Sequence, residues 1–75
     1  MREKTYNTVG ERIRYLRESA EMTRSSLAKK AYVNRSTVSR WEDNEIAPRI
    51  RDIETLSKLF NVSCDYLILG KTKNE

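Results

Sequence analysis

The chain has 75 residues, 37% of them hydrophobic and 35% charged, with a formal net charge of +4 and a sequence pI of about 9.5. This length allows one domain with one small core, and the helical spacing of the apolar residues is not that of a disordered chain. With no histidine, a single cysteine and no apolar run of membrane-spanning length, the sequence excludes a disulfide framework and a membrane span, and it gives little support to acid–base or metal chemistry.

The first predicted helix covers residues 8 to about 20. Thr8 and Glu11 are spaced as a capping box, in which a hydroxyl and a carboxylate three residues apart satisfy free N–H groups at a helix start. Gly10 weakens the first turn, but its missing side chain lets another segment approach closely. The apolar residues that recur at helical spacing are Val9, Ile13, Leu16 and Ala20.

Two short helices are predicted next, over about 23–31 and 34–43. Thr23 and Asn34 are favourable N-caps for them. Asn44 is expected to end the second of the two, because asparagine tolerates a left-handed backbone better than most residues. The residues expected to face inward are Leu27, Ala28, Ala31, Val38 and Trp41.

Two further helices complete the pattern. Pro48 suits a first helical turn and is expected to open a helix that ends near residue 60, where Asn61 can adopt a left-handed conformation. Ser63 is expected to cap a last helix, which Gly70 ends. The apolar residues of these two helices are Ile53, Leu56, Leu59, Phe60, Tyr66, Leu67 and Ile68.

Five helices without any strand pattern predict an all-α protein, a compact five-helix bundle over residues 8–70. Residues 1–7 are expected to be a flexible N-terminal segment and residues 71–75 a flexible tail. No linker divides the chain, so we expect a single domain. Cys64 is expected to be a buried or half-buried small hydrophobe rather than a redox or metal residue.

The positive charge is unevenly distributed. Residues 1–42 hold ten Lys or Arg and five acids, whereas residues 43–75 hold five and six. Within residues 23–41 there are five basic residues and no acid. A stretch of one sign, bounded by mixed charge, is typical of a surface that meets a polyanion.

The predicted helix over 34–43 has an unusual outer face. A solvated helix commonly carries Glu and Lys pairs, but this one presents short hydroxyl side chains and two arginines, Arg35 and Arg40. Short side chains let a helix lie close to another surface, and Arg can donate two hydrogen bonds to a guanine edge. The pattern therefore predicts a helix that enters the major groove of DNA.

Residues 9–69 resemble the helix-turn-helix domain of the phage-repressor and Cro-like regulators, also called the xenobiotic response element family. The matching stretches are "GERIRYLRE", "MTRSSLAKKAYVNRSTVSRWEDN", Pro48 and "LSKLFNVSCDYLILG". The resemblance implies a five-helix bundle whose third helix lies in the major groove. It also implies that Ala28 and Val38 are small inward positions and that Trp41 is a core anchor.

The resemblance further implies roles for individual side chains. It implies a structural ion pair between Arg17 and Glu42, and it places Arg24 where the family often has a phosphate-binding Gln. The residues expected to contact bases are Asn34, Arg35, Ser36 and Arg40. The residues expected to contact phosphates are Arg24, Lys29, Ser39, Arg49 and Arg51, although Lys29 and Ser39 also fit a plain exposed surface.

Three positions depart from the family pattern. Tyr32 stands where the turn between the second and third helices usually has Gly. Either Tyr32 adopts a left-handed conformation, at a cost of about 1–2 kcal/mol, or the turn is reshaped and the third helix tilts. Asn44 replaces a Gly that often follows the third helix, and Arg49 replaces a small capping residue.

The function expected from this pattern is sequence-specific binding of double-stranded DNA by a transcriptional regulator, a repressor of phage or mobile-element type. A homodimer would present two helices to half-sites about 34 Å apart on a pseudo-palindromic operator. Its interface is expected to use apolar residues on or near the last two helices: Ile46, Ile50, Tyr66 and Leu69. The alternative is a protein-interaction module on the same fold, such as an antitoxin or a co-regulator.

No cofactor, bound metal, membrane contact or enzymatic activity is expected. Neither a Gly-rich phosphate loop nor a metal-binding cluster is visible in the sequence. The N-terminus lacks the apolar stretch of a signal peptide, so we expect a cytoplasmic protein associated with the nucleoid.

Overall fold

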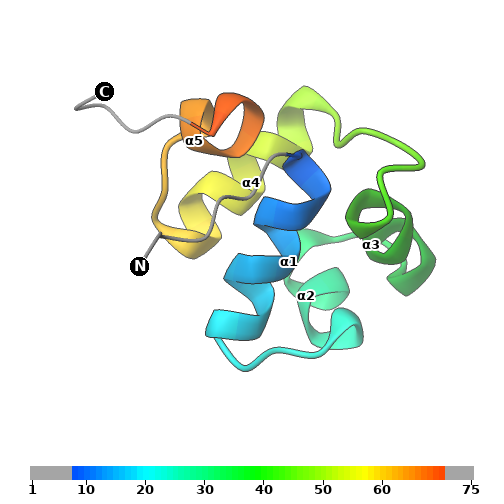
Figure 1. Cartoon of the computed structure of the whole chain (residues 1–75). Helices are drawn as coiled ribbons and strands as arrows, with labels where there is room; N and C mark the ends of the chain where they lie inside the picture. Colours follow the sequence, from blue (N-terminus) through cyan, green and yellow to red (C-terminus); the bar gives the residue numbers. More distant parts are fainter. Residues whose placement is uncertain (1–7, 71–75) are drawn as a thin grey trace, which may run out of the picture.

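The computed structural model describes residues 8–70, which form five helices and no strand (Figure 1). The helices are α1 (Val9–Ser19), α2 (Arg24–Ala31), α3 (Arg35–Glu42), α4 (Ile50–Phe60) and α5 (Cys64–Leu69). The all-α prediction is confirmed. The predictions for residues 1–7 and 71–75 lie outside the described residues.

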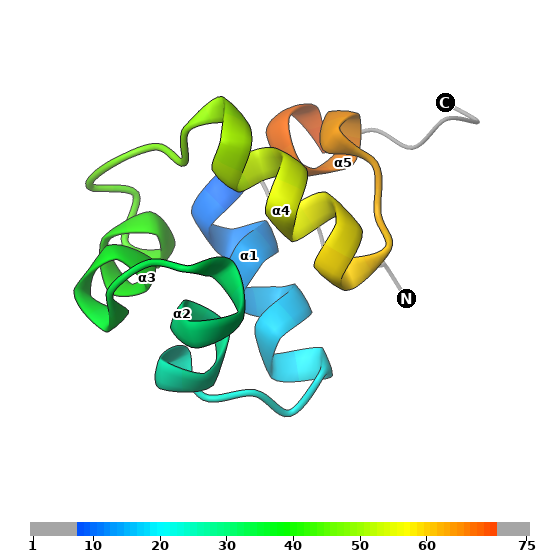
Figure 2. The same cartoon turned by 180° about the vertical axis from the view of Figure 1, so that it is seen from behind.

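The five helices pack around α1, which lies in the middle of the bundle (Figures 1 and 2). It contacts α3 on one side and α5 on the other, while α2 contacts both α3 and α4. As a result, α3 lies at one edge of the molecule, on the side away from α5 (Figure 1). No helix within residues 8–70 has the length and apolarity needed to cross a membrane.

Hydroxyl side chains begin three of the helices at the predicted positions. Thr8, Thr23 and Ser63 each accept a hydrogen bond from the backbone N–H three residues later, over 3.0 to 3.1 Å. Asn34 occupies the N-cap position of α3, but its side chain makes no capping hydrogen bond. The start of α3 therefore depends on its packing more than on a side-chain cap.

The predicted role of Pro48 is wrong. It lies before α4 rather than in its first turn, and Arg49 is the N-cap. The Asp52 carboxylate accepts a hydrogen bond from the Arg49 backbone N–H at 3.1 Å. This bond fixes Arg49 as the N-cap, so that α4 begins at Ile50, two residues after Pro48. The guanidinium of Arg49 has no acceptor atom and cannot cap the helix, so it extends from the surface.

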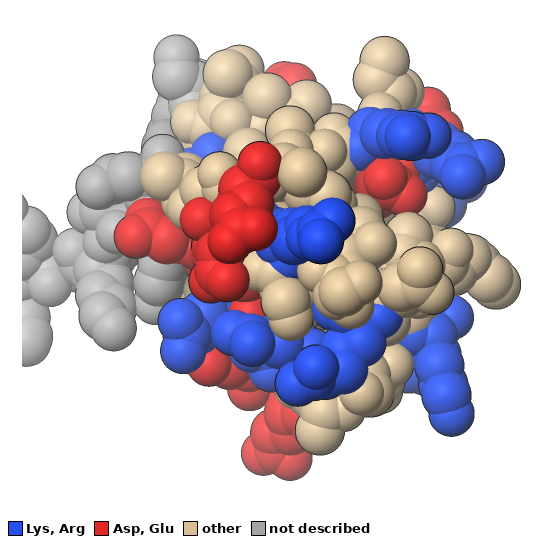
Figure 3. All heavy atoms as spheres, turned by 90° about the vertical axis from the view of Figure 1, so that its right-hand side faces the viewer, with Lys and Arg blue, Asp and Glu red and all other residues tan. Residues whose placement is uncertain are grey.

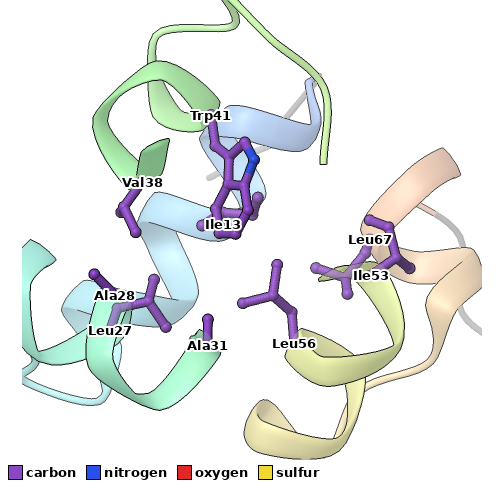
Figure 4. Close-up of a cluster of buried hydrophobic side chains, with 9 residues drawn as sticks. All are labelled: Ile13, Leu27, Ala28, Ala31, Val38, Trp41, Ile53, Leu56 and Leu67. Atoms are coloured by element: carbon purple, nitrogen blue, oxygen red, sulfur yellow. The ribbon is translucent and has the colours of Figure 1, made fainter. Parts of the chain in front are cut away.

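Every helix contributes to one core, drawn in Figure 4. Trp41 is 1% exposed and belongs to the same buried cluster as Ile13, so it anchors the inner face of α3 as expected (Figure 4). Three of the apolar residues that follow the predicted helical spacing are exposed: Ala20, which follows α1, Leu59 on α4 and Ile68 on α5. The buried core residues are Ile13, Leu27, Ala28, Ala31, Val38, Trp41, Ile53, Leu56 and Leu67.

The turn between α2 and α3 keeps a left-handed residue although it has no glycine. Tyr32 has φ 61° and ψ 40°, so the first of the two alternatives holds and the turn is not reshaped. The Val33 N–H donates to the Ala28 carbonyl at 3.0 Å and closes the turn. Tyr32 is 87% exposed, so the packing of its side chain contributes little against the energetic cost of the left-handed backbone.

Gly10 brings α1 against the end of α3. A Cβ at this position would lie 2.3 Å from the Trp41 carbonyl oxygen and 2.9 Å from that of Glu42. The Gly10 N–H donates to the Asn44 side chain at 3.1 Å, and Asn44 itself has the left-handed φ of 60° that was expected of it. The close approach expected at Gly10 is therefore present.

Candidate nucleic-acid interface

Helix α3 buries one face and exposes the other. Val38, Trp41 and Glu42 are buried, whereas Arg35, Ser36 and Arg40 are exposed. Figure 3, which looks at this side of the molecule, shows Lys and Arg side chains gathered on the surface and acidic side chains beside them. The side chains predicted to contact bases are thus presented to solvent by a helix that the core holds in place.

A buried ion pair fixes the C-terminal end of α3. The side chain of Glu42 is fully buried, and its Oε2 lies 2.6 Å from Arg17 Nε. Its Oε1 accepts a second hydrogen bond from Arg17 Nη2 at 3.1 Å, so the pair predicted from the family resemblance is bidentate. The Arg17 Nη1 also donates to the Met22 carbonyl at 2.9 Å, which ties α1 to the segment before α2.

Two neighbouring carboxylates act on the pKa of the Arg17 guanidinium. Its hydrogen bond to Glu42 raises the pKa of the Arg17 guanidinium above its ordinary value, while burial lowers it in part. The carboxylate of Glu18 lies 3.8 Å from Arg17 Nη2 and adds to the rise. The environment of Arg17 therefore favours its charged form.

Arg24 also contacts Glu42, which the sequence did not reveal. Its Nε lies 3.1 Å from Glu42 Oε1, and its side chain is 31% exposed. Arg24 is the first residue of α2, so the predicted phosphate-binding residue sits where a helix begins and close to the last residue of α3. A carboxylate partner 18 positions away has no local signal in the sequence.

The other predicted phosphate-binding residues are distributed around α3. Lys29 is exposed on α2, and Ser39 is half-buried on α3. Arg49 and Arg51 are exposed at the start of α4 and line an open groove of about 210 Å³. The groove is also lined by Val33, just before α3, and by Thr37 and Trp41 of α3. The position of Thr37 in this lining was not predicted from the sequence.

The apolar residues predicted to form a dimer interface differ in exposure. Ile50 is 81% exposed, Leu69 61% and Ile46 43%, whereas Tyr66 is half-buried. Ile46 and Ile50 lie before and at the start of α4, and the other two lie on α5. Cys64 is half-buried against the core, as expected, and residues 8–70 contain no cluster of acidic or sulfur ligands that could hold a metal ion.

Arg12 is a buried arginine whose role was not predicted from the sequence. It is 4% exposed and lies on α1. Its Nε donates to the Leu67 carbonyl at 3.0 Å and its Nη2 to the Ile68 carbonyl at 2.9 Å. These carbonyls are among those left free at the end of α5, so Arg12 attaches that helix to the centre of the bundle.

Comparison with known proteins gives sequence relatives among bacterial and phage regulators. The transcriptional regulator DicA of Escherichia coli is 36% identical over 63 residues, which cover 84% of this chain and 47% of DicA. Repressor protein C2 of Salmonella phage P22 is 36% identical over 62 residues, covering 83% of this chain and 29% of C2. The transcriptional activator BcrR of Enterococcus faecalis is 33% identical over 61 residues, 81% of this chain and 30% of BcrR. The chain thus spans less than half the length of each of these relatives.

Solved structures with a similar backbone include proteins bound to DNA. The P22 c2 repressor in complex with a synthetic operator has a TM-score of 0.81 and 34% identity, over 85% of this chain and 97% of that one. SinR in complex with DNA has a TM-score of 0.73 and 34% identity, over 80% of this chain and 97% of that one.

The helix-turn-helix family model matches residues 13–67, which include α2, α3 and the turn between them. The relatives named above are a transcriptional activator, a transcriptional regulator and a repressor, which agrees with the expectation of a DNA-binding regulator. The chain belongs to the helix-turn-helix family of Cro/C1-type DNA-binding domains.

Proposed function

We propose that this protein binds double-stranded DNA at a specific operator, with α3 in the major groove, and thereby represses transcription. The observation that carries the proposal is the exposed polar face of an otherwise buried helix, within a stretch of 19 residues, 23–41, that contains no acid. Such a face can approach the negatively charged groove without electrostatic penalty. The likeness of the backbone to a repressor bound to its operator supports the same placement.

The proposed base contacts come from the N-cap, the first turn and the last turn of α3. Arg35 and Arg40 can each donate two hydrogen bonds to a guanine, and each such pair is worth about 1–3 kcal/mol of discrimination against a wrong base. Ser36 is short enough to let the helix axis approach the base edges. Asn34 makes no capping hydrogen bond, so its amide is available to an adenine edge.

The proposed phosphate contacts surround this helix. Arg24 and Lys29 on α2, together with Ser39, would hold the DNA backbone on one side of the groove. Arg49 and Arg51, beside the groove that α3 shares with the start of α4, would hold it on the other. Contacts of this kind fix the register of α3 and make the affinity strongly dependent on salt.

We further propose that the protein acts as a homodimer on a pseudo-palindromic operator. A single eight-residue recognition helix contacts few base pairs, and two copies would present two such helices about 34 Å apart on one face of the DNA. The exposed apolar residues Ile46, Ile50 and Leu69 are the proposed interface, with Tyr66 at its border. The site of action would be the nucleoid, in the cytoplasm.

The test is fluorescence anisotropy with labelled duplexes. One duplex carries the DNA upstream of the gene for this protein, and the other carries the same bases in scrambled order, across a salt series. A repressor of its own gene should prefer the first by about a thousandfold, with affinity falling steeply as salt rises. Equal weak binding would place the operator elsewhere, and selection from a random pool would find it.

A protein partner is the second candidate function. One structure with this backbone, at TM-score 0.73 and 34% identity over 80% of this chain and 59% of that one, is a complex of the SinR protein with the SinI protein. The exposed Ile50 and Leu69 could serve such a contact without DNA. Absence of DNA binding even at low salt would favour this function over the first.

A further inference from the structure

The carboxylate of Glu42 binds two arginines although one would satisfy it. Arg17 alone engages both oxygens, through Nε at 2.6 Å and Nη2 at 3.1 Å. Arg24 adds a third hydrogen bond, from its Nε to Oε1 at 3.1 Å. Since the Arg17 pair already neutralises the buried charge, Arg24 is not needed for that purpose.

The second arginine has a free edge. A guanidinium carries five N–H donors in one plane, and Glu42 occupies only the Nε donor of Arg24. Within residues 8–70 the Nη1 and Nη2 groups of Arg24 donate to no other side chain or carbonyl, and the side chain is 31% exposed. Four donors in a fixed plane therefore remain for a ligand from outside the protein.

The charge balance favours an anionic ligand. Arg17 and Arg24 carry two positive charges against the single negative charge of Glu42. The carboxylate of Glu18 also lies 3.8 Å from Arg17 Nη2, but it is paired with Arg14 at 3.1 Å, so three arginines face two carboxylates and the cluster keeps one net positive charge. The unpaired N–H groups at the beginning of α2 add a partial positive charge beside Arg24.

We propose, on the basis of the DNA-binding function above, that Glu42 is a positioning residue for Arg24. Its carboxylate holds the Nε side of the guanidinium, so that the opposite Nη edge receives an oxygen pair of a DNA backbone phosphate. Arg24 loses less side-chain freedom on binding than an unattached arginine would, because Glu42 has already restricted it. Since Glu42 is the last residue of α3, the same link fixes the distance between this phosphate and the helix that reads the bases.

A lysine at position 24 tests this geometry. Arg24→Lys keeps the charge, but its single nitrogen cannot hold Glu42 and a phosphate from opposite edges of one plane. Arg24→Gln removes the charge and serves as the reference for a lost contact. The matched control is Arg14→Lys, because Arg14 binds Glu18 through Nε at the same 3.1 Å but on the exposed surface of α1.

We expect Arg24→Lys to weaken DNA binding by about tenfold and to lower the salt slope by about 0.9, close to the effect of Arg24→Gln. Arg14→Lys should stay within about twofold of the unaltered protein, because exposed ion pairs contribute little. Thermal melts of all three variants separate these effects from unfolding. Binding by Arg24→Lys that equals that of the unaltered protein, with the same slope, would show that only the charge matters and would overturn the proposal.

A measurement on the unaltered protein gives a second test. The Nε–H resonance of Arg24 should show a slowly exchanging, hydrogen-bonded proton both without DNA and in the complex with a mixed-sequence duplex at low salt. Loss of that protection on adding DNA would mean that Arg24 leaves Glu42 and would overturn the proposal. If the unaltered protein binds no duplex at all, the DNA-binding function itself fails, and the two failures are thus distinguishable.

Discussion

Replacement of Gly10 by alanine should destabilise this protein although the same change stabilises most helices. Gly10 is the second residue of α1, a helical position where alanine is ordinarily better by about 0.5–1 kcal/mol. Here the added Cβ would lie 2.3 Å from the Trp41 carbonyl oxygen, 2.7 Å from Asn44 Oδ1 and 2.9 Å from the Glu42 carbonyl oxygen. Two of these three atoms belong to the backbone of α3 or its end and cannot rotate away.

The magnitude follows from the shift that the methyl group requires. Ordinary contact begins near 3.4 Å, so α1 and the end of α3 must separate by about 1 Å. Overpacking of this kind costs about 1–3 kcal/mol, and weakening the Gly10 N–H to Asn44 hydrogen bond adds about 1 kcal/mol. After the helix-propensity gain of alanine is subtracted, we expect a net loss of about 1–3.5 kcal/mol in the free energy of unfolding.

Urea denaturation followed by the fluorescence of Trp41, the only tryptophan, measures this loss. Asn44→Gly is the control, because it removes the acceptor side chain while keeping a residue that tolerates φ 60°. It should lose no more than the hydrogen bond, about 1 kcal/mol. If Gly10→Ala raised the midpoint instead, the contact between α1 and α3 would not be tight, and the account of how α3 is held would be refuted.

Three further changes test separate parts of the structure. Tyr32→Gly should stabilise the protein by about 0.5–1 kcal/mol, because relief of the left-handed strain exceeds the entropy that glycine adds to the unfolded chain; a lower melting temperature would contradict this. Glu42→Gln should cost about 3–5 kcal/mol in urea denaturation, because it leaves the buried Arg17 without its charge partner, and a loss below about 1 kcal/mol would count against that burial. Arg40→Ala should weaken operator binding by about 1–3 kcal/mol in anisotropy titrations while binding to scrambled DNA changes little; an equal loss on both would make Arg40 a phosphate contact.

Much of the fold was predictable because its signals are local. Thr8, Thr23 and Ser63 cap helices within three residues of themselves, and such bonds depend only on the neighbouring backbone. Asn44 and Asn61 adopt the left-handed conformations expected at helix ends. The errors arose where a local pattern competed with packing: the spacing of apolar residues included Leu59, which the packing of the helices leaves 36% exposed on α4.

The contacts that the sequence could not reveal join residues far apart in the chain. Arg12 and Arg14 are two residues apart on α1 and have the same side chain, yet Arg12 is buried and caps the end of α5 whereas Arg14 is exposed. The sequence shows that Arg12 is next to the core residue Ile13, but it does not show which helix end lies against the Arg12 side chain. The same holds for Arg24, since its bond to Glu42 depends on how α2 crosses α3. Long polar side chains with several donors have many potential partners, and only the packing of the helices selects one.

The recognition helix is held by its ends and by one face, and this separates its stability from its specificity. Helix α3 has eight residues and several middling helix formers, so in isolation it would be largely unfolded. At its beginning the left-handed turn at Tyr32 sets the direction of α3 relative to α2, and at its end the contacts of Gly10 and of the buried Glu42 fix its position. None of these contacts uses the exposed face of Arg35, Ser36 and Arg40. Substitutions on that face should therefore change which DNA is bound without unfolding the domain, whereas substitutions at the two ends should weaken binding to every sequence alike.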